Sequence, residues 1–580
     1  MEVVFPSLSS LEFHSAFGDV ERGIKALEEY FHKHSIEKGS HSGSEVFDEL
    51  VPAYNSVLEQ LRVINAYIHA FTSTDSRDEL AAAKESEIDQ LHVSVRKLSK
   101  RFAAWIGGLD LEALLASSEV AKAHEYMLIK AKISSQHLMR PGEEMLASEL
   151  EVTGMSAWSK LHGNVTSQLT IPIEVDGEIQ NLPMSVVRNF AYDPDRERRR
   201  TAFEAELAGW KTVEVPLAAA MNGVKGEVST LCRHRKWDEP LDEALLSCNI
   251  DRHTLDAMML AATEAFPIFR RYLKAKAKAL GLEKLAFYDL FAPLGSSEQT
   301  WEYPEACDFV VEQFHGYSHK LGEFASRSFR ENWIDAGPRA GKTDGAYCMS
   351  IRKDESRILM NYKPSFGSVS TLAHELGHGY HNLCLYGRTP LQRATPMTLA
   401  ETASIFCETI IRQAVLKDGT PGEQLAVLEA SLQGSCQVVV DISSRFFFEK
   451  WVFEARAKRE LSGREMCEIM QRAQLETYGD GLDSDYLHPY MWAAKSHYYG
   501  RSYYNFPYMF GLLFGLGLYA VYQRDPEPFK AHYDDLLSST GLADAATLGK
   551  RFGIDITKPD FWRASLDQIR ADVDRFEALI

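Results

Sequence analysis

The sequence predicts a mainly α-helical protein with a small β region. Strand patterns are confined to two short regions, residues 169–182 and 345–362. Elsewhere, apolar residues recur every three or four positions with charged residues between them, as in amphipathic helices. This helical pattern covers residues 18–34, 45–72, 77–107, 109–136, 194–233, 251–281 and 302–329, and is almost continuous from residue 371 onward.

The first β region is predicted to be a β-hairpin. Residues 169–175 and 178–182 are two short strand-like runs on either side of Asp176-Gly177, a pair favoured in two-residue hairpin turns. A domain boundary is expected just after it. We therefore expect an N-terminal helical domain over residues 1–190 that ends in the hairpin, and a second, catalytic domain over residues 191–580.

Length and composition indicate a large globular protein. The chain has 580 residues, of which 45% are hydrophobic and 25% charged, close to the average for folded proteins. A chain of this size can bury a large core without help from a metal or from disulfides. Any bound metal is therefore expected to serve chemistry and not folding.

The charge balance argues against nucleic acid or an anionic membrane as a partner. Lys and Arg number 63 and Asp and Glu 82, so the formal net charge is −19. The nearest approach to a basic block, residues 196–200, is interrupted by Glu197 and set among acids. Proteins that bind polyanions usually carry a clear basic patch.

The cysteines and the apolar stretches favour a cytoplasmic protein. The eight cysteines are scattered and form no Cys-x-x-Cys pair, as expected for free thiols in a reducing compartment. Residues 1–6 lack the basic and apolar features of a signal peptide. The most apolar stretch, residues 508–522, contains three glycines and is too short to cross a bilayer. It is expected to be a buried helix.

The segment that carries chemistry is His374-Glu375-Leu376-Gly377-His378. Histidines at i and i+4 leave the same face of a helix one turn apart, so both imidazoles can reach one metal ion. Glu375 lies beside them and can accept a proton from an activated water. The alternative is an ordinary polar helix face. The β-rich stretch and the Ser/Gly-rich turn before the motif favour one Zn²⁺ per chain, bound by His374 and His378.

A catalytic zinc needs a third protein ligand. His381 lies on the same helix face, but three histidines in a row along one helix cannot surround a metal. Glu401 and Glu408 fall in the next helical segment, residues 398–415. We favour Glu401 as the ligand and expect Glu408 to accept the remaining N–H of a ligand histidine.

Glu401 also has a purely structural interpretation. Thr398-x-x-Glu401 matches a capping box, in which the carboxylate would bond only the helix start. Thr395-Pro396 offers a rival start, with Thr as N-cap and Pro at the first helical position. If the helix begins there, Glu401 is available for the metal.

A second cluster of polar and aromatic residues covers residues 497–508. His497, Tyr504 and Tyr508 could donate hydrogen bonds to the negative charge that peptide hydrolysis builds on the carbonyl oxygen. The alternative is an aromatic core segment, and we expect it to hold for most of these residues. Buried tyrosine hydroxyls need partners, so it is not expected to hold for all.

Taken together, these motifs resemble the oligoendopeptidase F family, a branch of the thimet-oligopeptidase-like zinc metallopeptidases. The resemblance is specific over about residues 340–520 and looser from about residue 150. It is carried by residues 345–348, 358–362, 371–381, 400–408 and 504–508.

The resemblance implies a two-lobed helical fold with a deep substrate channel and zinc at its floor. It implies an endopeptidase that cuts internal bonds of short, unstructured peptides. Zinc would be bound by His374, His378 and Glu401, and Glu375 would be the general base. His497 and Tyr508 would assist. Only Gly500 stands where the thimet-type relatives have a glycine-rich loop, so Tyr504 is kept as the alternative hydroxyl.

Two rival functions remain at this point. A zinc carboxypeptidase with the same motif would need a cation for the substrate carboxylate, for which Arg352, Lys353 and Arg501 are candidates. A non-catalytic peptide-binding scaffold is the other, and retention of the whole His-Glu-x-x-His motif speaks against it. For either enzyme, strand residues 358–362 are expected to pair with extended substrate backbone.

Overall fold

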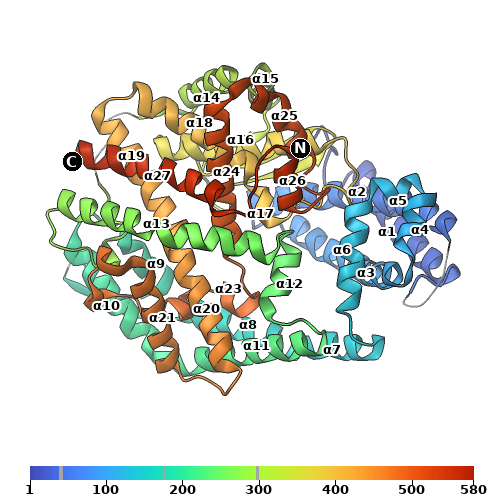
Figure 1. The fold of residues 1–580 in the computed structure, drawn as a ribbon, viewed down its shortest axis with the longest axis horizontal. Coiled ribbons are helices and arrows are strands. Elements are labelled where there is room, and N and C mark those ends of the chain that lie inside the picture. Colours follow the sequence, from blue (N-terminus) through green and yellow to red (C-terminus); the bar gives the residue numbers. More distant parts are fainter. Residues whose placement is uncertain (38–42, 176, 295–299) are drawn as a thin grey trace. The chain divides into compact units, whose positions relative to one another are not determined.

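The computed structural model describes residues 1–37, 43–175, 177–294 and 300–580 (Figure 1). The chain forms two compact units, each assembled from three segments. Unit 1 comprises Met1–Leu138, Gln299–Ala414 and Val521–Phe552, and unit 2 comprises Met139–Glu298, Val415–Ala520 and Gly553–Ile580. The backbone contacts thus group the chain differently from the boundary expected near residue 190. The predicted mainly α-helical class is confirmed.

Unit 1 begins with a bundle of long helices around an aromatic core. Trp105, Phe13 and Phe47 are fully buried in that core. The elements of the first segment are α1 (Leu11–Lys33), α2 (Ser44–Thr74), α3 (Glu79–Gly108), α4 (Leu111–Ser117), α5 (Glu119–Ala123) and α6 (Glu125–Gln136).

The prediction of one continuous helix over residues 109–136 was wrong. Ser118 separates α4 from α5, because its side-chain oxygen accepts a hydrogen bond from the Ala121 backbone N–H and caps the second helix. His124 then separates α5 from α6. Apolar spacing can continue across such short breaks, so periodicity alone did not reveal them.

The rest of unit 1 holds the small mixed sheet and the helices around it. Strand order in the sheet is β3-β5-β4, with β3 parallel and β4 antiparallel to the central strand β5. The elements are α14 (Tyr303–Tyr317), α15 (His319–Arg330), β3 (Ile334–Asp335), β4 (Tyr347–Arg352), β5 (Glu355–Leu359), α16 (Phe366–Leu385), α17 (Met397–Ala400), the start of α18 (Thr402–Asp418), the end of α24 (Phe506–Arg524), α25 (Pro526–Ser538) and α26 (Ala545–Arg551).

Unit 2 brings helices together from distant parts of the sequence; α13 and α27, for example, pack side by side (Figure 1). Its helices are α7 (Pro141–Thr153), α8 (Met155–Gln168), α9 (Met184–Asn189), α10 (Arg196–Thr212), α11 (Glu214–His234), α12 (Pro240–Ser247), α13 (Arg252–Ala279), α19 (Pro421–Cys436), α20 (Ile442–Arg456), α21 (Gly463–Tyr478), α22 (Met491–Ala494), α23 (His497–Gly500), most of α24 and α27 (Pro559–Leu579). Short turns of 3₁₀ or π helix are η1 (Phe190–Tyr192), η2 (Phe287–Asp289), η3 (Gln437–Asp441), η4 (Gly479–Gly481) and η5 (Ser484–Tyr486).

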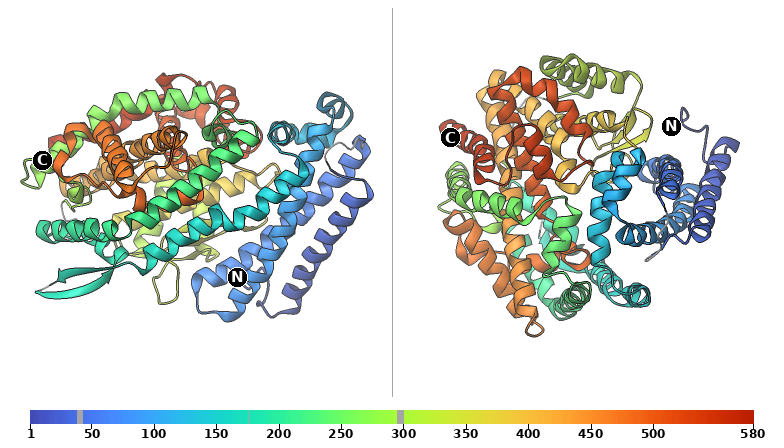
Figure 2. Two further views of the ribbon diagram at one scale, coloured as in Figure 1. Left: turned by 90° about the horizontal axis from the view of Figure 1, so that it is seen from below. Right: turned by 45° about the vertical axis from the view of Figure 1, so that its right-hand side comes forward.

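The predicted hairpin is present in unit 2 as β1 (Thr170–Val175) and β2 (Glu178–Pro183), the paired turquoise arrows of Figure 2. Asp176, the first residue of the predicted turn, lies outside the described residues. Ile171 and Ile173 are buried while Pro172 is exposed, so one face of β1 packs on the unit. Ile171 contacts α10 at Gly209, where a side chain would collide with it.

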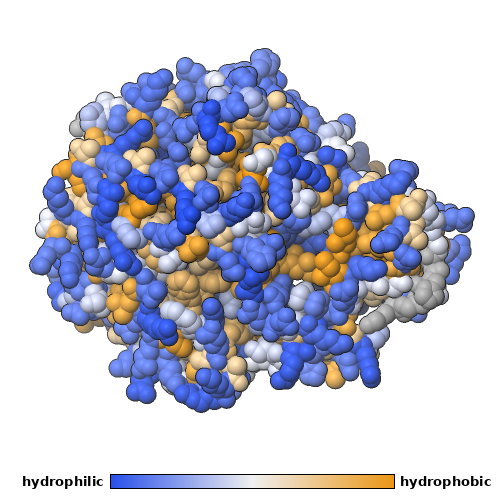
Figure 3. All heavy atoms as spheres, viewed as in Figure 1, coloured by the Kyte–Doolittle hydropathy of each residue, from blue (hydrophilic) through white to orange (hydrophobic). Residues whose placement is uncertain are grey.

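Hydrophilic residues cover most of the face shown in Figure 3, in keeping with the charged composition. Within the part of the chain that the structure describes, one helical stretch, Pro421–Arg456, is long and apolar enough to cross a membrane. Of its most apolar window, 56% is buried inside the protein. Core helices of soluble proteins pass the same test, so the stretch is weak evidence for a membrane segment.

Candidate metal centre

Helix α16 carries the His-Glu-x-x-His motif near its middle. The Ser365 side chain caps the helix start by accepting the Ser368 backbone N–H. Phe366 to Leu385 is helical throughout, so His374 and His378 project from one face as their spacing predicts. Their rings lie 4.9 Å apart, centre to centre.

Gly377 lets the next part of the chain approach this helix closely. A Cβ on Gly377 would lie 2.6 Å from both the Ala403 carbonyl oxygen and the Ser404 Cα. Carbon atoms do not come that near to backbone, so only glycine fits here. The start of α18 therefore lies directly against the histidine helix, and Glu401 is positioned beside it.

Glu401 brings a carboxylate to both histidines. One oxygen, Oε2, lies 3.2 Å from His374 Nε2 and 3.4 Å from His378 Nε2. The Ser404 hydroxyl donates to the same oxygen at 2.7 Å and fixes its direction. One ligand atom from each of the three residues lies within 4.8 Å of the others.

These three donors fit a zinc ion. Zinc takes His nitrogens and carboxylate oxygens at about 2.0–2.1 Å, so ligand atoms at neighbouring corners of a tetrahedron are roughly 3.3 Å apart. The distances of Glu401 Oε2 from the two histidine Nε2 atoms, 3.2 and 3.4 Å, match that spacing. Three protein donors also leave one position for water or substrate, as in catalytic sites.

Glu408 occupies the position next to the ligand set. Its Oε2 lies 3.2 Å from Nδ1 of His374, the ring nitrogen that faces away from Glu401. Ser370 donates to the other Glu408 oxygen at 3.1 Å. Such a contact orients the imidazole and keeps its Nε2 available to a metal. Glu408 thus contacts the ring nitrogen of His374 that does not face Glu401, as predicted for a residue that orients a ligand histidine.

His381 points elsewhere. Its side chain is buried, and Nε2 lies 3.1 Å from the Leu537 carbonyl and 3.0 Å from the Thr540 hydroxyl. Burial is the main cause that lowers its pKa to about 4, so the ring is neutral at pH 7. This histidine anchors α16 to the end of α25 and to the residues that follow it.

Glu375 is buried beside the histidines with unused hydrogen-bonding capacity. It is 5% exposed, and its Oε2 has no hydrogen-bond partner among the described residues. Burial raises the pKa of this carboxyl, while His374 and His378 act in the opposite direction. An orphaned, desolvated carboxylate beside a metal site is suited to accept a proton.

The contacts of His374 and Glu401 with their neighbours shift the pKa values of both side chains. Burial alone would lower the pKa of His374, but its hydrogen bonds to Glu401 and Glu408 outweigh this and raise it to about 10. For Glu401, burial raises the pKa, and the two histidines together bring it far below the usual range. Glu401 therefore carries a negative charge beside the two histidine rings, as a carboxylate ligand of a metal ion must.

The capping-box interpretation of Glu401 was wrong. Thr398 lies inside the short helix α17, whose N-cap is Pro396, and Glu401 is the residue at which α17 ends. The predicted continuous helix over residues 398–415 is accordingly broken between Ala400 and Thr402. That break lets the Glu401 side chain turn toward α16.

The expected pairing of residues 358–362 with substrate backbone does not fit the sheet. β5 is the central strand, and Leu359 pairs with both Tyr347 of β4 and Asp335 of β3. The N–H groups of Met360 and Tyr362 also bond the β3 side. An added strand would have to pair with one of the outer strands, β3 or β4.

His497, Tyr504 and Tyr508 lie together in unit 2. The imidazole of His497 stacks on the Tyr504 ring at 4.7 Å, and the Tyr508 hydroxyl donates to that of Tyr504 at 3.1 Å. Tyr508 is 37% exposed, whereas Tyr498 and Tyr499 are fully buried. The aromatic-core interpretation therefore holds for some of these tyrosines and not for others.

Tyr504 and Asn505 precede α24 and are not helical, so Tyr504 and Tyr508 do not lie on one helix. Burial, and then the nearby Arg445 and Lys495, lower the pKa of His497. The ring is therefore neutral at pH 7. Its Nδ1 is buried without a partner among the described residues.

Sequence reasoning missed three contributors to these sites. The role of Gly377 depends on a contact with Ala403 that sequence spacing cannot reveal. Ser370 and Ser404, which orient the two glutamates, carry no pattern of their own. Each serine lies about one helical turn along the chain from a proposed ligand, His374 or Glu401. That spacing is the signal by which the sequence could have identified them.

A helical protein with a His-Glu-x-x-His helix and a convergent third carboxylate has the build of a metallopeptidase. The model of peptidase family M3 matches residues 189–568, which is more than half of the chain. The chain therefore belongs to peptidase family M3, and the family resemblance inferred from the motifs is confirmed.

Relatives and solved structures agree with this assignment. Oligopeptidase PepF of Bacillus subtilis is 22% identical over all of this chain and 87% of its own length. The oligoendopeptidase F homolog of Lactococcus lactis is 21% identical over 90% of this chain and 88% of its own. Among solved structures, oligoendopeptidase-F from Enterococcus faecium superposes with a TM-score of 0.71 at 18% identity over 98% of both chains. A peptidase-like protein from Chlamydophila abortus gives 0.83 at 21% identity over 96% of both.

Proposed function

We propose that this peptidase is a zinc-dependent endopeptidase that cuts internal bonds of short, unstructured peptides. The observation that carries the proposal is the convergence of His374, His378 and Glu401 with the orphaned carboxylate of Glu375 beside them. Membership of the M3 family and the oligopeptidase names of its relatives support the same conclusion.

His374, His378 and Glu401 would hold the zinc ion. When bound, zinc acts as a Lewis acid and lowers the pKa of a water molecule. Glu408 and Ser404 keep two of the donors aligned. A site whose side chains are already positioned loses little entropy when substrate and water arrive.

Glu375 would act as the general base. Its burial raises the pKa of the carboxyl, which strengthens it as a base for the attacking water. The same carboxyl then delivers the proton to the leaving amine. His497 and Tyr508, with Tyr504 as the alternative, would donate to the oxygen on which negative charge develops.

The substrate would be an extended peptide. β4 is the strand of the sheet beside α16 whose outer edge could pair with peptide backbone. A channel that admits extended chains and excludes folded domains would account for the oligopeptidase names of the relatives. We further propose that the protein is soluble and cytoplasmic, with neither nucleic acid nor membrane as partner.

Digestion of a mixed peptide library with purified protein tests the function. Mass analysis should show internal cleavage of short peptides, loss of activity with a chelator and recovery with zinc. Native globular proteins should survive the same treatment. Removal of single residues from the C-terminus would instead identify a carboxypeptidase. If no peptide is cleaved with or without added metal, the protein is a non-catalytic peptide-binding scaffold.

A further inference from the structure

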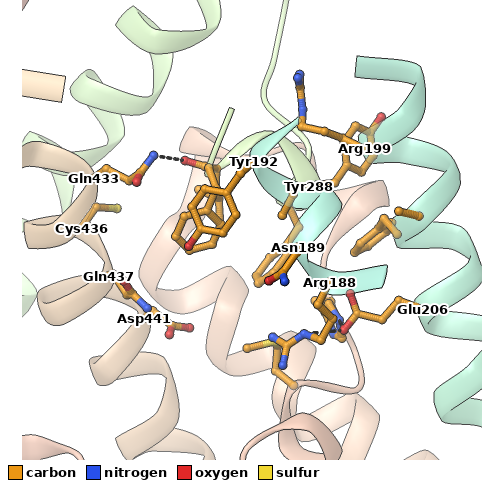
Figure 4. A pocket seen from close by; sticks show the side chains of 18 of the residues that line it. Arg188, Asn189, Tyr192, Arg199, Glu206, Tyr288, Gln433, Cys436, Gln437 and Asp441 are labelled. Carbon is orange, nitrogen blue, oxygen red and sulfur yellow. Dashed lines mark hydrogen bonds and ion pairs between the residues drawn. The ribbon is translucent and has the colours of Figure 1, made fainter. Parts of the chain in front are cut away.

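Unit 2 contains a cavity whose lining includes none of the metal-binding residues. Its volume is about 360 Å³, within the range of small-molecule sites. Figure 4 shows it between Gln433, Gln437 and Asp441 on one side and Arg199 and Glu206 on the other. The wall between them is formed by α9, η1 and the η2 segment.

The carboxylates of the cavity are already engaged. Glu206 is contacted by Arg188 at 3.0 Å, by His488 at 3.1 Å and by the Trp210 indole at 3.0 Å. Burial raises the pKa of Glu206, but these partners hold it at about 2. Asp441 pairs with Arg445 on the next turn. Each carboxylate is thus already paired with an arginine, so neither is available to bind a cation.

The cations of the cavity exceed what these acids neutralise. Arg199 reaches Asp289 behind the wall at 2.9 Å. Lys495 lines the same cavity, and among the residues that the structure describes no hydrogen bond or ion pair reaches its ammonium group. Arg445 is 7% exposed, and its Nε is buried without a partner. The half-buried Lys495 and the buried Arg445 therefore have donors available to an anion.

The pKa of Lys495 also indicates that the cavity lacks an anion to pair with this side chain. Burial, and then the repulsion of Arg445, lower the pKa of Lys495 to about 8. Asp441 and Glu206 raise the pKa of Lys495 but do not offset this lowering, and Arg188 lowers it further. A carboxylate placed between Lys495 and Arg445 would remove this penalty and gain charge-assisted hydrogen bonds.

The remaining wall suits an organic ligand. Gln437 and Asp441 bound a short π-helix, η3, and such interruptions of α-helices are frequent at functional sites. Gln437 is exposed and can contact a ligand without rearrangement. Tyr192 and Tyr288 present aromatic surface in the middle of the cavity (Figure 4).

The cavity is also linked to a proposed catalytic group within the same unit. Lys495 is two residues before His497, and Lys495 and Arg445 both lower the pKa of His497. A substrate carboxylate bound by these cations would therefore lie near the segment that holds the proposed transition-state donors.

We propose that this cavity is a substrate subsite that binds a carboxylate of the peptide, through Lys495 and Arg445, with Gln437 at its rim. The proposal rests on the proposed peptidase function. The carboxylate belongs either to the peptide C-terminus or to an Asp or Glu side chain, and the chemistry of recognition is the same for both. The subsite would make the enzyme prefer peptides that carry an accessible carboxylate.

Equilibrium binding to the full-length chain tests this without requiring turnover. Three kinds of fluorescent hexapeptide are titrated into the Glu375→Gln protein: one with uncharged side chains and a free C-terminal carboxylate, its C-terminal amide, and a series in which that amide carries one Glu at successive positions. We expect at least one acidic peptide to bind tenfold or more tightly than the neutral amide. The free acid and the Glu series tell which carboxylate is recognised.

Variants then locate the site. Lys495→Met should abolish the preference and leave binding of the neutral amide within about twofold, whereas Lys495→Arg should retain it. Gln437→Glu, an isosteric change at an exposed position, should weaken the acidic peptides by repulsion. The control is Lys211→Met, which removes the same charge from an exposed site on α10.

Equal binding of all three kinds of peptide would overturn the proposal, and so would a preference that survives both Lys495→Met and Gln437→Glu. The two proposals fail separately. Zinc-dependent cleavage without any effect of Lys495 rejects the subsite and keeps the peptidase. Lys495-dependent binding without hydrolysis by the wild-type chain keeps the carboxylate site and rejects the proposed activity.

Discussion

Gly377 of α16 lies against Ala403 of α18 so closely that a methyl group on the glycine would be 2.6 Å from the Ala403 carbonyl oxygen. This contact brings the third carboxylate to the two histidines, although none of the three proposed ligands takes part in it. The position of the metal centre is therefore set by the packing of two helices as well as by its donors.

Gly377→Ala should separate the two helices and damage the metal centre. Overpacking of this kind costs about 1–3 kcal/mol. We expect a lower melting temperature and reduced zinc content by metal analysis. Gly367→Ala on the same helix is the control, because its Cβ would meet only the Ser365 hydroxyl at 3.9 Å. Equal zinc content in both variants would show that the close approach is not needed.

Glu401→Ala should lose zinc, whereas Glu408→Ala should retain most of it with weaker affinity. Glu401 contributes a donor atom that faces both histidines, while Glu408 contacts His374 at Nδ1 and does not reach its Nε2. Loss of an orienting partner typically weakens metal binding by about 10–100-fold. Metal analysis after dialysis measures both. Full zinc in Glu401→Ala with none in Glu408→Ala would reverse the assignment.

Glu375→Gln should retain zinc and peptide binding but lose turnover by more than about 100-fold, because an amide cannot accept the proton of the attacking water. Steady-state kinetics and metal analysis on the same preparation test this. Activity within tenfold of wild type, about 1.4 kcal/mol of barrier, would contradict the role.

His497→Ala and Tyr508→Phe should each lower kcat by about 100-fold and leave KM and zinc content nearly unchanged. A donor aimed at the developing oxyanion acts mainly in the transition state. Tyr504→Phe is the comparison, since its hydroxyl accepts the Tyr508 hydrogen bond. If Tyr504→Phe alone shows the large loss of kcat, the functional hydroxyl is that of Tyr504.

Affinity for an acidic peptide should fall as pH rises from about 7 to 9. The pKa of Lys495 is lowered to about 8, and only the protonated form attracts a carboxylate. Binding is therefore complete below this pKa and is lost above it. Titration of the Glu375→Gln protein across this range measures the loss. The peptide affinity of the Lys495→Met variant should not change over the same range. A protein with Lys495 intact whose affinity is equally independent of pH would contradict the prediction.

The sequence by itself determined the helical class and the hairpin, because apolar periodicity and an Asp-Gly turn are local properties of the chain. It also placed His374 and His378 on one helix face, since a spacing of four residues fixes their direction. The proposal of Glu401 as third ligand came from the sequence too, but a capping role for it remained equally compatible with the local pattern.

Only the tertiary structure decided where that carboxylate points. Glu401 reaches both histidines because the chain breaks between α17 and α18, and because Gly377 allows the second helix to approach. The same holds for the cavity of unit 2, whose cations Arg188 and Lys495 are more than 300 residues apart in the chain. Long-range packing sets such neighbours, and no local spacing in the sequence records it.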